Sequence, residues 1–82
     1  MLTSDEQKVV SDLVITNIGN LNEVKEFDFS VKCDSCSDDE IDALDQLCAN
    51  PSAVTQIGEC LWISVRYSCV KEEYEISGNV SK

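Results

Sequence analysis

The chain contains no histidine and only three glycines and one proline. General acid–base catalysis near neutral pH most often uses histidine. The sequence also lacks the nucleophile elbow, the phosphate loop and the dinucleotide fingerprint. We therefore expect a protein that is not an enzyme and needs no cofactor.

Long hydrophobic runs are absent as well, since no apolar stretch approaches the roughly 18–20 residues that span a bilayer. Residues 1–6 have neither the basic nor the apolar region of a signal peptide. The five cysteines are an odd number, which fits poorly with complete pairing, so we interpret them as thiols in a reducing compartment. These features predict a cytoplasmic protein that does not bind membranes.

Positive charge is scarce, with six Lys and Arg against sixteen Asp and Glu, and the net charge is −10. Such a chain repels nucleic acid and is attracted to basic surfaces, including those that hold nucleic acid. The alternative interpretation is that the acidity serves only solubility. The length of 82 residues and the hydrophobic content of 43% predict one globular domain over residues 1–82.

Two capping boxes predict where helices begin. Thr3 is followed three residues later by Glu6, and Ser37 by Glu40. Apolar residues then recur at helical spacing, which predicts helices over about 5–17, ended by Gly19, and over about 38–49.

The pair Asn50 and Pro51 is expected to end the second helix. The same pair can begin a short third helix. In that helix Val54 and Ile57 would face inward, and Gly58 would stop it.

Alternating apolar and polar residues predict strands over 24–33, 59–70 and 73–81. The last two are expected to form a hairpin around an even-length loop, which keeps their apolar residues on one side of the sheet. The expected pairs are Cys69 with Tyr74, Tyr67 with Ile76, and Ile63 with Val80. The order α-β-α-α-β-β predicts an α+β fold, a three-stranded antiparallel sheet with two to three helices packed on one face.

Acidic residues gather on one arc of the helix predicted over 38–49. They are Asp38, Asp39, Asp42 and Asp45, with Asp34 just upstream. A helix of this length spans about 18 Å, which gives one charge per roughly 4 Å. The phosphates of one DNA strand are about 3.4 Å apart, so the spacing is compatible with imitation of a phosphate backbone. The alternative is a solvated face of an amphipathic helix.

The outer face of the sheet is a second candidate surface. If the helices cover Leu61 and Ile63, Trp62 lies on the opposite face, where an exposed Trp is a good interface anchor. The alternative is a Trp that is half covered by neighbouring structure. Arg66 is expected to pair diagonally with Glu75 there.

Cys33 and Cys36 have the spacing of half a zinc knuckle and of a thiol-redox motif. A complete zinc site would need Cys48 and Cys60. However, we interpret Cys48 on its helix and Cys69 on its strand as small buried hydrophobic residues. A metal-binding or redox module at Cys33 and Cys36 is therefore the alternative function.

In size, acidity and charge clustering, the chain resembles small inhibitors made by phages and mobile elements, such as anti-CRISPR proteins and DNA mimics. The resemblance is compositional, covers no defined motif and carries over no residue roles. It implies a non-catalytic inhibitor or adaptor that docks an acidic surface on the basic, nucleic-acid-binding site of a larger protein in a host cell. We expect a monomer or weak homodimer that does not bind nucleic acid directly. The candidate partner-binding residues are Asp34, Asp38, Asp39, Asp42, Asp45, Trp62, Glu72, Glu73 and Glu75.

Overall fold

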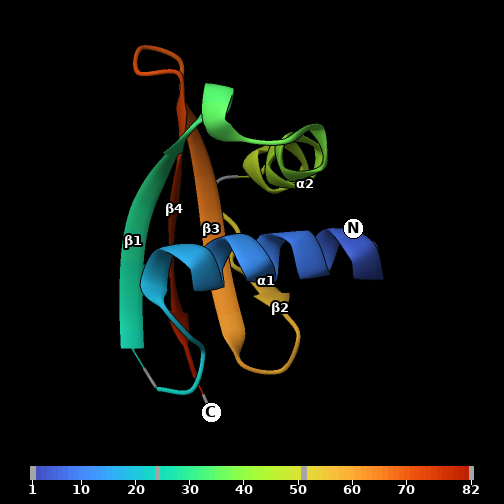
Figure 1. Cartoon of the computed structure of the whole chain (residues 1–82), viewed down its shortest axis with the longest axis vertical. Helices are drawn as coiled ribbons and strands as arrows, with labels where there is room; N and C mark the ends of the chain where they lie inside the picture. Colours follow the sequence, from blue (N-terminus) through green and yellow to red (C-terminus); the bar gives the residue numbers. More distant parts are fainter. Residues whose placement is uncertain (1, 24, 51, 82) are drawn as a thin grey trace.

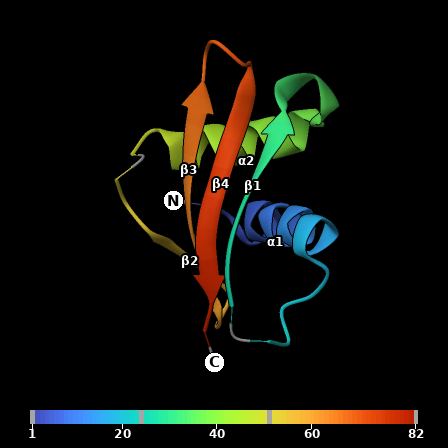
Figure 2. The same ribbon diagram turned by 90° about the vertical axis from the view of Figure 1, so that its left-hand side faces the viewer.

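The computed structural model describes residues 2–23, 25–50 and 52–81, which form two helices on one face of an antiparallel sheet (Figure 1). The helices are α1 (Ser4–Ile18) and α2 (Asp38–Cys48), with a 3₁₀ turn, η1 (Cys33–Ser35), before α2. The strands are β1 (Lys25–Lys32), β2 (Thr55–Ile57), β3 (Leu61–Ser68) and β4 (Glu73–Val80). Their order across the sheet is β1-β4-β3-β2. Within these residue ranges, the other face of the sheet carries no helix (Figure 2).

The fold is therefore α+β, but the expected three-stranded sheet is wrong, because the sheet of the described residues has four strands. The additional strand is β2, which lies within the segment expected to be a third helix. Thr55 pairs with Ile63, and Ile57 pairs with Leu61. The β-branched residues of β2 suit a strand, and β3 offers them an edge with free backbone groups.

The turns on either side of β2 explain why no helix forms there. The Ala53 N–H donates to the Asn50 carbonyl at 3.0 Å, which closes a single turn. Gly58 adopts a φ of 67° in the short connection to β3, a conformation that glycine tolerates and other residues rarely adopt. Ile57 is buried as expected, whereas Val54 is 62% exposed. The role expected of Pro51 lies outside the described residues.

Both predicted long helices are confirmed, and each begins at its capping box. The Glu6 N–H donates to the Thr3 hydroxyl at 3.1 Å, while the Thr3 N–H donates to the Glu6 carboxylate at 2.9 Å. Ser37 and Glu40 form the same reciprocal pair at the start of α2. Gly19, with a φ of 102°, ends α1.

The hairpin of β3 and β4 keeps the expected parity but not the expected register. Val65 pairs with Ile76 and Tyr67 with Tyr74, so the three expected pairs are wrong by two residues. The chain turns through a four-residue loop, which is still an even length. In this loop the Lys71 N–H donates to the Ser68 hydroxyl at 3.3 Å. Cys69 consequently lies in the loop and is exposed, contrary to the prediction that it is buried.

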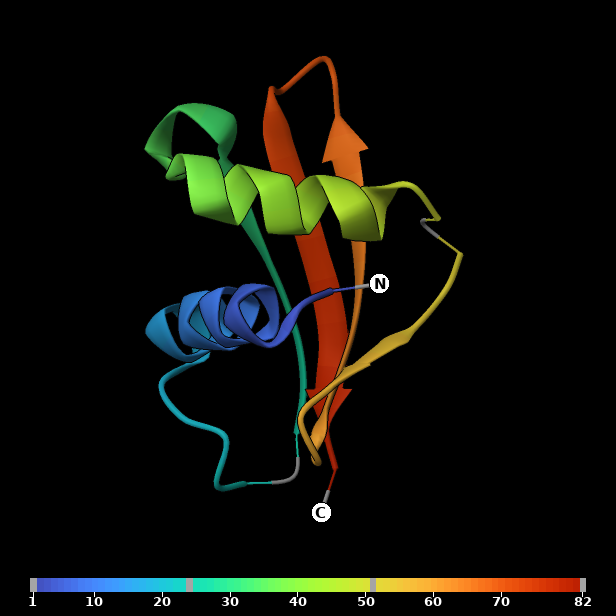
Figure 3. The same ribbon diagram turned by 90° about the vertical axis from the view of Figure 1, so that its right-hand side faces the viewer.

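The core lies between the sheet and the two helices (Figure 3). From the sheet it receives the inward residues of β3 and β4, and Trp62, Ser64 and Arg66 lie on the opposite face, as predicted. The buried residues are Leu2, Val10, Val14, Ala43, Leu44, Leu47, Ile57, Leu61, Ile63, Val65, Tyr74, Ile76 and Val80. Within the described ranges, neither helix has both the length and the apolar content needed to cross a membrane.

Candidate functional site

The structure separates the predicted partner-binding residues into three groups. The four aspartates of α2 lie in the helix layer, whereas Trp62 and Glu75 lie on the open face of the sheet. Asp34, in η1, Glu72, in the loop before β4, and Glu73, the first residue of β4, lie near the end of the β3–β4 hairpin. There the Cys33 N–H donates to the Glu72 carbonyl at 3.0 Å. The nine residues therefore do not form one continuous surface.

Two of the α2 aspartates instead meet acids of α1. Asp39 and Asp42 line a hollow of about 210 Å³ together with Asp5, Glu6 and Val9. We call the four carboxylates, Asp5, Glu6, Asp39 and Asp42, the helix-side acidic surface. The Gln46 side-chain amide donates to the Glu6 carboxylate and ties the two helices together at this point.

Sequence reasoning missed Asp5 and Glu6 as site residues. Their position in the first turn of a predicted helix was visible, and acids are favoured there by the helix dipole. What the sequence did not reveal is that α1 and α2 pack side by side and so bring their acidic first halves together.

None of the described lysines forms an ion pair with these carboxylates. The one ion pair among the described residues joins Lys32 to Glu73 at 3.4 Å, away from the helix-side acidic surface. The pKa of Glu6 is lowered chiefly by the hydrogen bond from the Thr3 backbone, with the Thr3 hydroxyl and Gln46 adding to the effect. Glu6 therefore keeps its negative charge at neutral pH.

Asp45 has a different partner. The hydroxyl of Tyr74 donates to the Asp45 carboxylate at 2.6 Å, and Tyr74 is only 2% exposed. Burial, followed by this hydrogen bond, raises the pKa of Tyr74. The contact satisfies a phenol that would otherwise be buried without a partner, so Asp45 contributes to the packing of α2 on the sheet.

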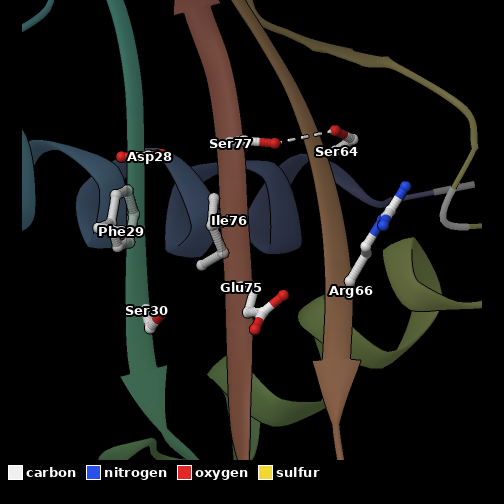
Figure 4. Close-up of a pocket in the computed structure, with 8 residues that line it drawn as sticks. All are labelled: Asp28, Phe29, Ser30, Ser64, Arg66, Glu75, Ile76 and Ser77. Carbon is white, nitrogen blue, oxygen red and sulfur yellow. Dashed lines mark hydrogen bonds between the residues drawn. The ribbon is translucent and has the colours of Figure 1, made fainter.

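The open face of the sheet contains a hollow of about 450 Å³ with polar side chains from β1, β4 and β3 (Figure 4). The Ser64 and Ser77 hydroxyls meet at 3.3 Å, and Asp28 and Glu75 contribute carboxylates. Arg66 lies directly opposite Glu75, not diagonally, and its guanidinium points away from the carboxylate. The expected pairing of Arg66 with Glu75 is therefore wrong.

Trp62 lies on the same face, opposite Asn79 on β4. Its side chain is half-buried, which agrees with the alternative interpretation of a partly covered Trp. It can contribute contact area to a partner on this face, but it does not line the hollow.

The cysteine pair receives little support as a metal or redox site. Burial, and then the nearby Glu40, raises the pKa of the Cys36 thiol, whereas metal binding and thiol exchange use the thiolate. The Cys36 thiol donates to the Lys32 carbonyl at 3.4 Å. All five cysteines are free. Within residues 2–23, 25–50 and 52–81, no three His, Cys, Asp or Glu side chains are grouped to hold a metal.

The candidate surfaces are thus the helix-side acidic surface, the polar hollow on the open face, and the end of the hairpin beside η1. Of these, only the first combines acids from two separate helices. Comparison with protein-family models gave no match, and comparisons with curated proteins and with solved structures gave none either.

Proposed function

We propose that this chain is a small, non-catalytic cytoplasmic protein that binds a larger protein through the helix-side acidic surface. It would cover a basic, nucleic-acid-binding site on that partner, as an inhibitor or adaptor. The observation that carries the proposal is that Asp5, Glu6, Asp39 and Asp42 from two helices converge and that no lysine in the described part of the chain is paired to them.

Electrostatics supports this choice of partner. Like charges placed together repel one another, so the arrangement lowers the stability of the free protein and favours a partner that supplies positive charge. The net charge of −10 extends the attraction beyond the surface itself and speeds encounter with a basic protein. The compositional resemblance to phage inhibitors and DNA mimics agrees with this interpretation.

The rigidity of the two helix starts also supports the proposed function. Both acidic helix starts are fixed by capping boxes, and the helices join one hydrophobic core. A surface that is ordered before binding loses less conformational entropy on association. The carboxylates therefore present a defined pattern, as a mimic of regularly spaced phosphates requires.

The test compares two variants that carry the same net charge. Asp39→Lys combined with Asp42→Lys changes the helix-side acidic surface. Asp12→Lys combined with Glu59→Lys changes exposed acids elsewhere. Each purified protein is immobilised and exposed to host lysate, and captured proteins are then tested for nucleic-acid binding. We expect the first variant to lose about tenfold or more in affinity for the captured partner, which is about 1.4 kcal/mol, and the control to retain most of it.

Competition and salt provide the second readout. DNA or RNA should displace the chain from its partner. Raising salt from about 0.1 M to about 1 M, which shortens the Debye length from about 10 Å to about 3 Å, should release it. Equal losses in the two variants, or binding that ignores both salt and nucleic acid, would refute the proposal.

A further inference from the structure

The helix layer is wider than the sheet that it covers. α1 has 15 residues and so spans about 22 Å, whereas the axes of the two outermost of four strands at about 4.8 Å spacing lie about 14 Å apart. Figure 2 shows that α1 crosses behind the strands and that its C-terminal end projects past β1. No described strand covers the end of α1 that projects past β1, beside which the connection from α1 to β1 also runs.

The backbone of β1 has free hydrogen-bonding groups on that side. The Cys33 N–H donates to the Glu72 carbonyl, and hydrogen-bonded pairs alternate along an antiparallel ladder. The odd-numbered residues of β1 thus bond to β4, and the even-numbered residues turn their N–H and C=O groups outward. These are Glu26, Asp28, Ser30 and Lys32, although the Lys32 carbonyl already accepts from the Cys36 thiol at 3.4 Å. The strand order places no described strand beyond them.

This edge lacks the usual protection against strand pairing. Edge strands are commonly short or interrupted by proline or a bulge. β1 is eight residues long and contains neither proline nor glycine. It pairs with β4 along its whole length without a bulge. Of the usual features that prevent an edge strand from pairing with another strand, β1 therefore has only charged side chains.

The side chains of β1 indicate which segment would fit. On the helix side, Phe27, Phe29 and Val31 are half-buried although they touch the core, and the two phenylalanine rings stack with centroids 6.0 Å apart. A neighbouring strand would cover them with apolar residues. On the other side, Glu26 and Asp28 would face the intervening residues, where basic side chains are favoured.

We propose that the outer edge of β1 binds an extended segment of a partner protein as a fifth strand, with apolar residues alternating with lysine or arginine. This inference does not rest on the proposed function, because it uses a different surface. A second copy of the chain is the other candidate occupant of this edge, and the experiment below distinguishes the two.

The test uses peptides as probes of the isotopically labelled full chain. The first alternates valine and lysine over eight residues, which matches the length of β1. The second has the same composition with the valines and lysines in two separate blocks. The third alternates valine and glutamate. We expect the first peptide to slow hydrogen exchange at the Glu26, Asp28, Ser30 and Lys32 amides by about tenfold or more, and to bind about tenfold more tightly than the others.

Variants separate strand pairing from simple charge attraction. Ser30→Pro removes an outward N–H that β4 does not use, and it should abolish binding, whereas Ser30→Ala should not. Glu26→Lys combined with Asp28→Lys keeps the backbone and should reverse the preference to the valine–glutamate peptide. The control pair Asp12→Lys and Glu59→Lys should leave the preference unchanged.

Three results would overturn the proposal. Peptide-induced changes could map to α2 and not to β1. The block peptide could bind as tightly as the alternating one. Protection of the four outward amides could appear with rising protein concentration alone, which would assign the edge to a second copy of the chain.

Discussion

Asp45 and Tyr74 form a hydrogen bond between the helix layer and the sheet. Because the Tyr74 ring is buried and its hydroxyl donates to a carboxylate, we expect Tyr74→Phe to lower the free energy of unfolding by about 1–2 kcal/mol. Urea denaturation measures this change. Tyr67→Phe is the matched control at a ring that is 41% exposed, and it should change stability by less than about 0.5 kcal/mol. Equal losses in both variants would contradict a specific role of the Asp45 contact.

Cys48 should make stability depend on alkaline pH. Burial, and then Asp45, raises the pKa of its thiol from 9.0 to about 11. The folded state thus holds this proton more tightly than the unfolded state. The resulting stabilisation is complete below pH 9.0, the pKa in the unfolded chain, and is lost as pH rises toward about 11.

The measurement is urea denaturation at several pH values between about 8 and 11, which brackets the shifted pKa. We expect the free energy of unfolding to fall less steeply across this window in Cys48→Ala than in the unchanged protein. Cys69→Ala, at an exposed thiol, should keep the original slope. A Cys48→Ala variant with an unchanged slope would show that other groups, such as Tyr74, cause the dependence.

At the scale of elements, the start of α1 supports both the fold and the helix-side acidic surface. Thr3→Ala removes the hydroxyl that accepts from the Glu6 N–H, and such a loss costs about 1 kcal/mol. We expect a corresponding decrease in thermal stability by circular dichroism. Thr3→Ser retains the hydroxyl and should behave nearly as the unchanged protein does. A similar loss in both would indicate that the threonine methyl group, not the cap, stabilises α1.

The β4 strand shows how one residue constrains the pairing of two elements. A Cβ on Gly78 would press against the Trp62 carbonyl and lie 2.9 Å from the Ile63 Cα. The close approach of β3 at this point therefore requires glycine. This requirement agrees with the observed register, in which Gly78 lies opposite Ile63.

For the whole molecule, the helix-side acidic surface should cost stability. Asp42 lies beyond the first turn of α2, three residues after Asp39, and lines the same hollow as Asp5 and Glu6 of α1. Because like charges that line one hollow repel, we expect Asp42→Asn to raise the free energy of unfolding by about 0.2–0.5 kcal/mol in chemical denaturation at low salt. The same substitution should weaken partner binding. The gain in the free energy of unfolding should be smaller at high salt. A loss of stability in Asp42→Asn would show instead that Asp42 has a structural partner.

The two proposed surfaces lie on different parts of the molecule. The helix-side acidic surface lies in the helix layer, whereas the β1 edge ends the sheet. A partner could engage either one without covering the other, so variants at one surface should leave binding at the other intact. This independence allows the two proposals to fail separately.

Local chemistry in the sequence determined both long helices and the three long strands. The capping boxes at Thr3 and Ser37 fixed the helix starts, because a side chain three residues away satisfies the free backbone groups. Period-two alternation identified the strands and correctly separated the Trp62 face from the core. The acidic arc of α2 was also visible from spacing alone.

Only the tertiary structure decided the rest, because those features depend on contacts between segments far apart in the chain. β2 forms because β3 offers it a free edge, which local spacing does not reveal. The packing of α1 against α2 brings Asp5 and Glu6 beside Asp39 and Asp42. The role of Asp45 depends on the position of Tyr74. The open β1 edge likewise follows from strand order, which the sequence specifies only through the complete packed core.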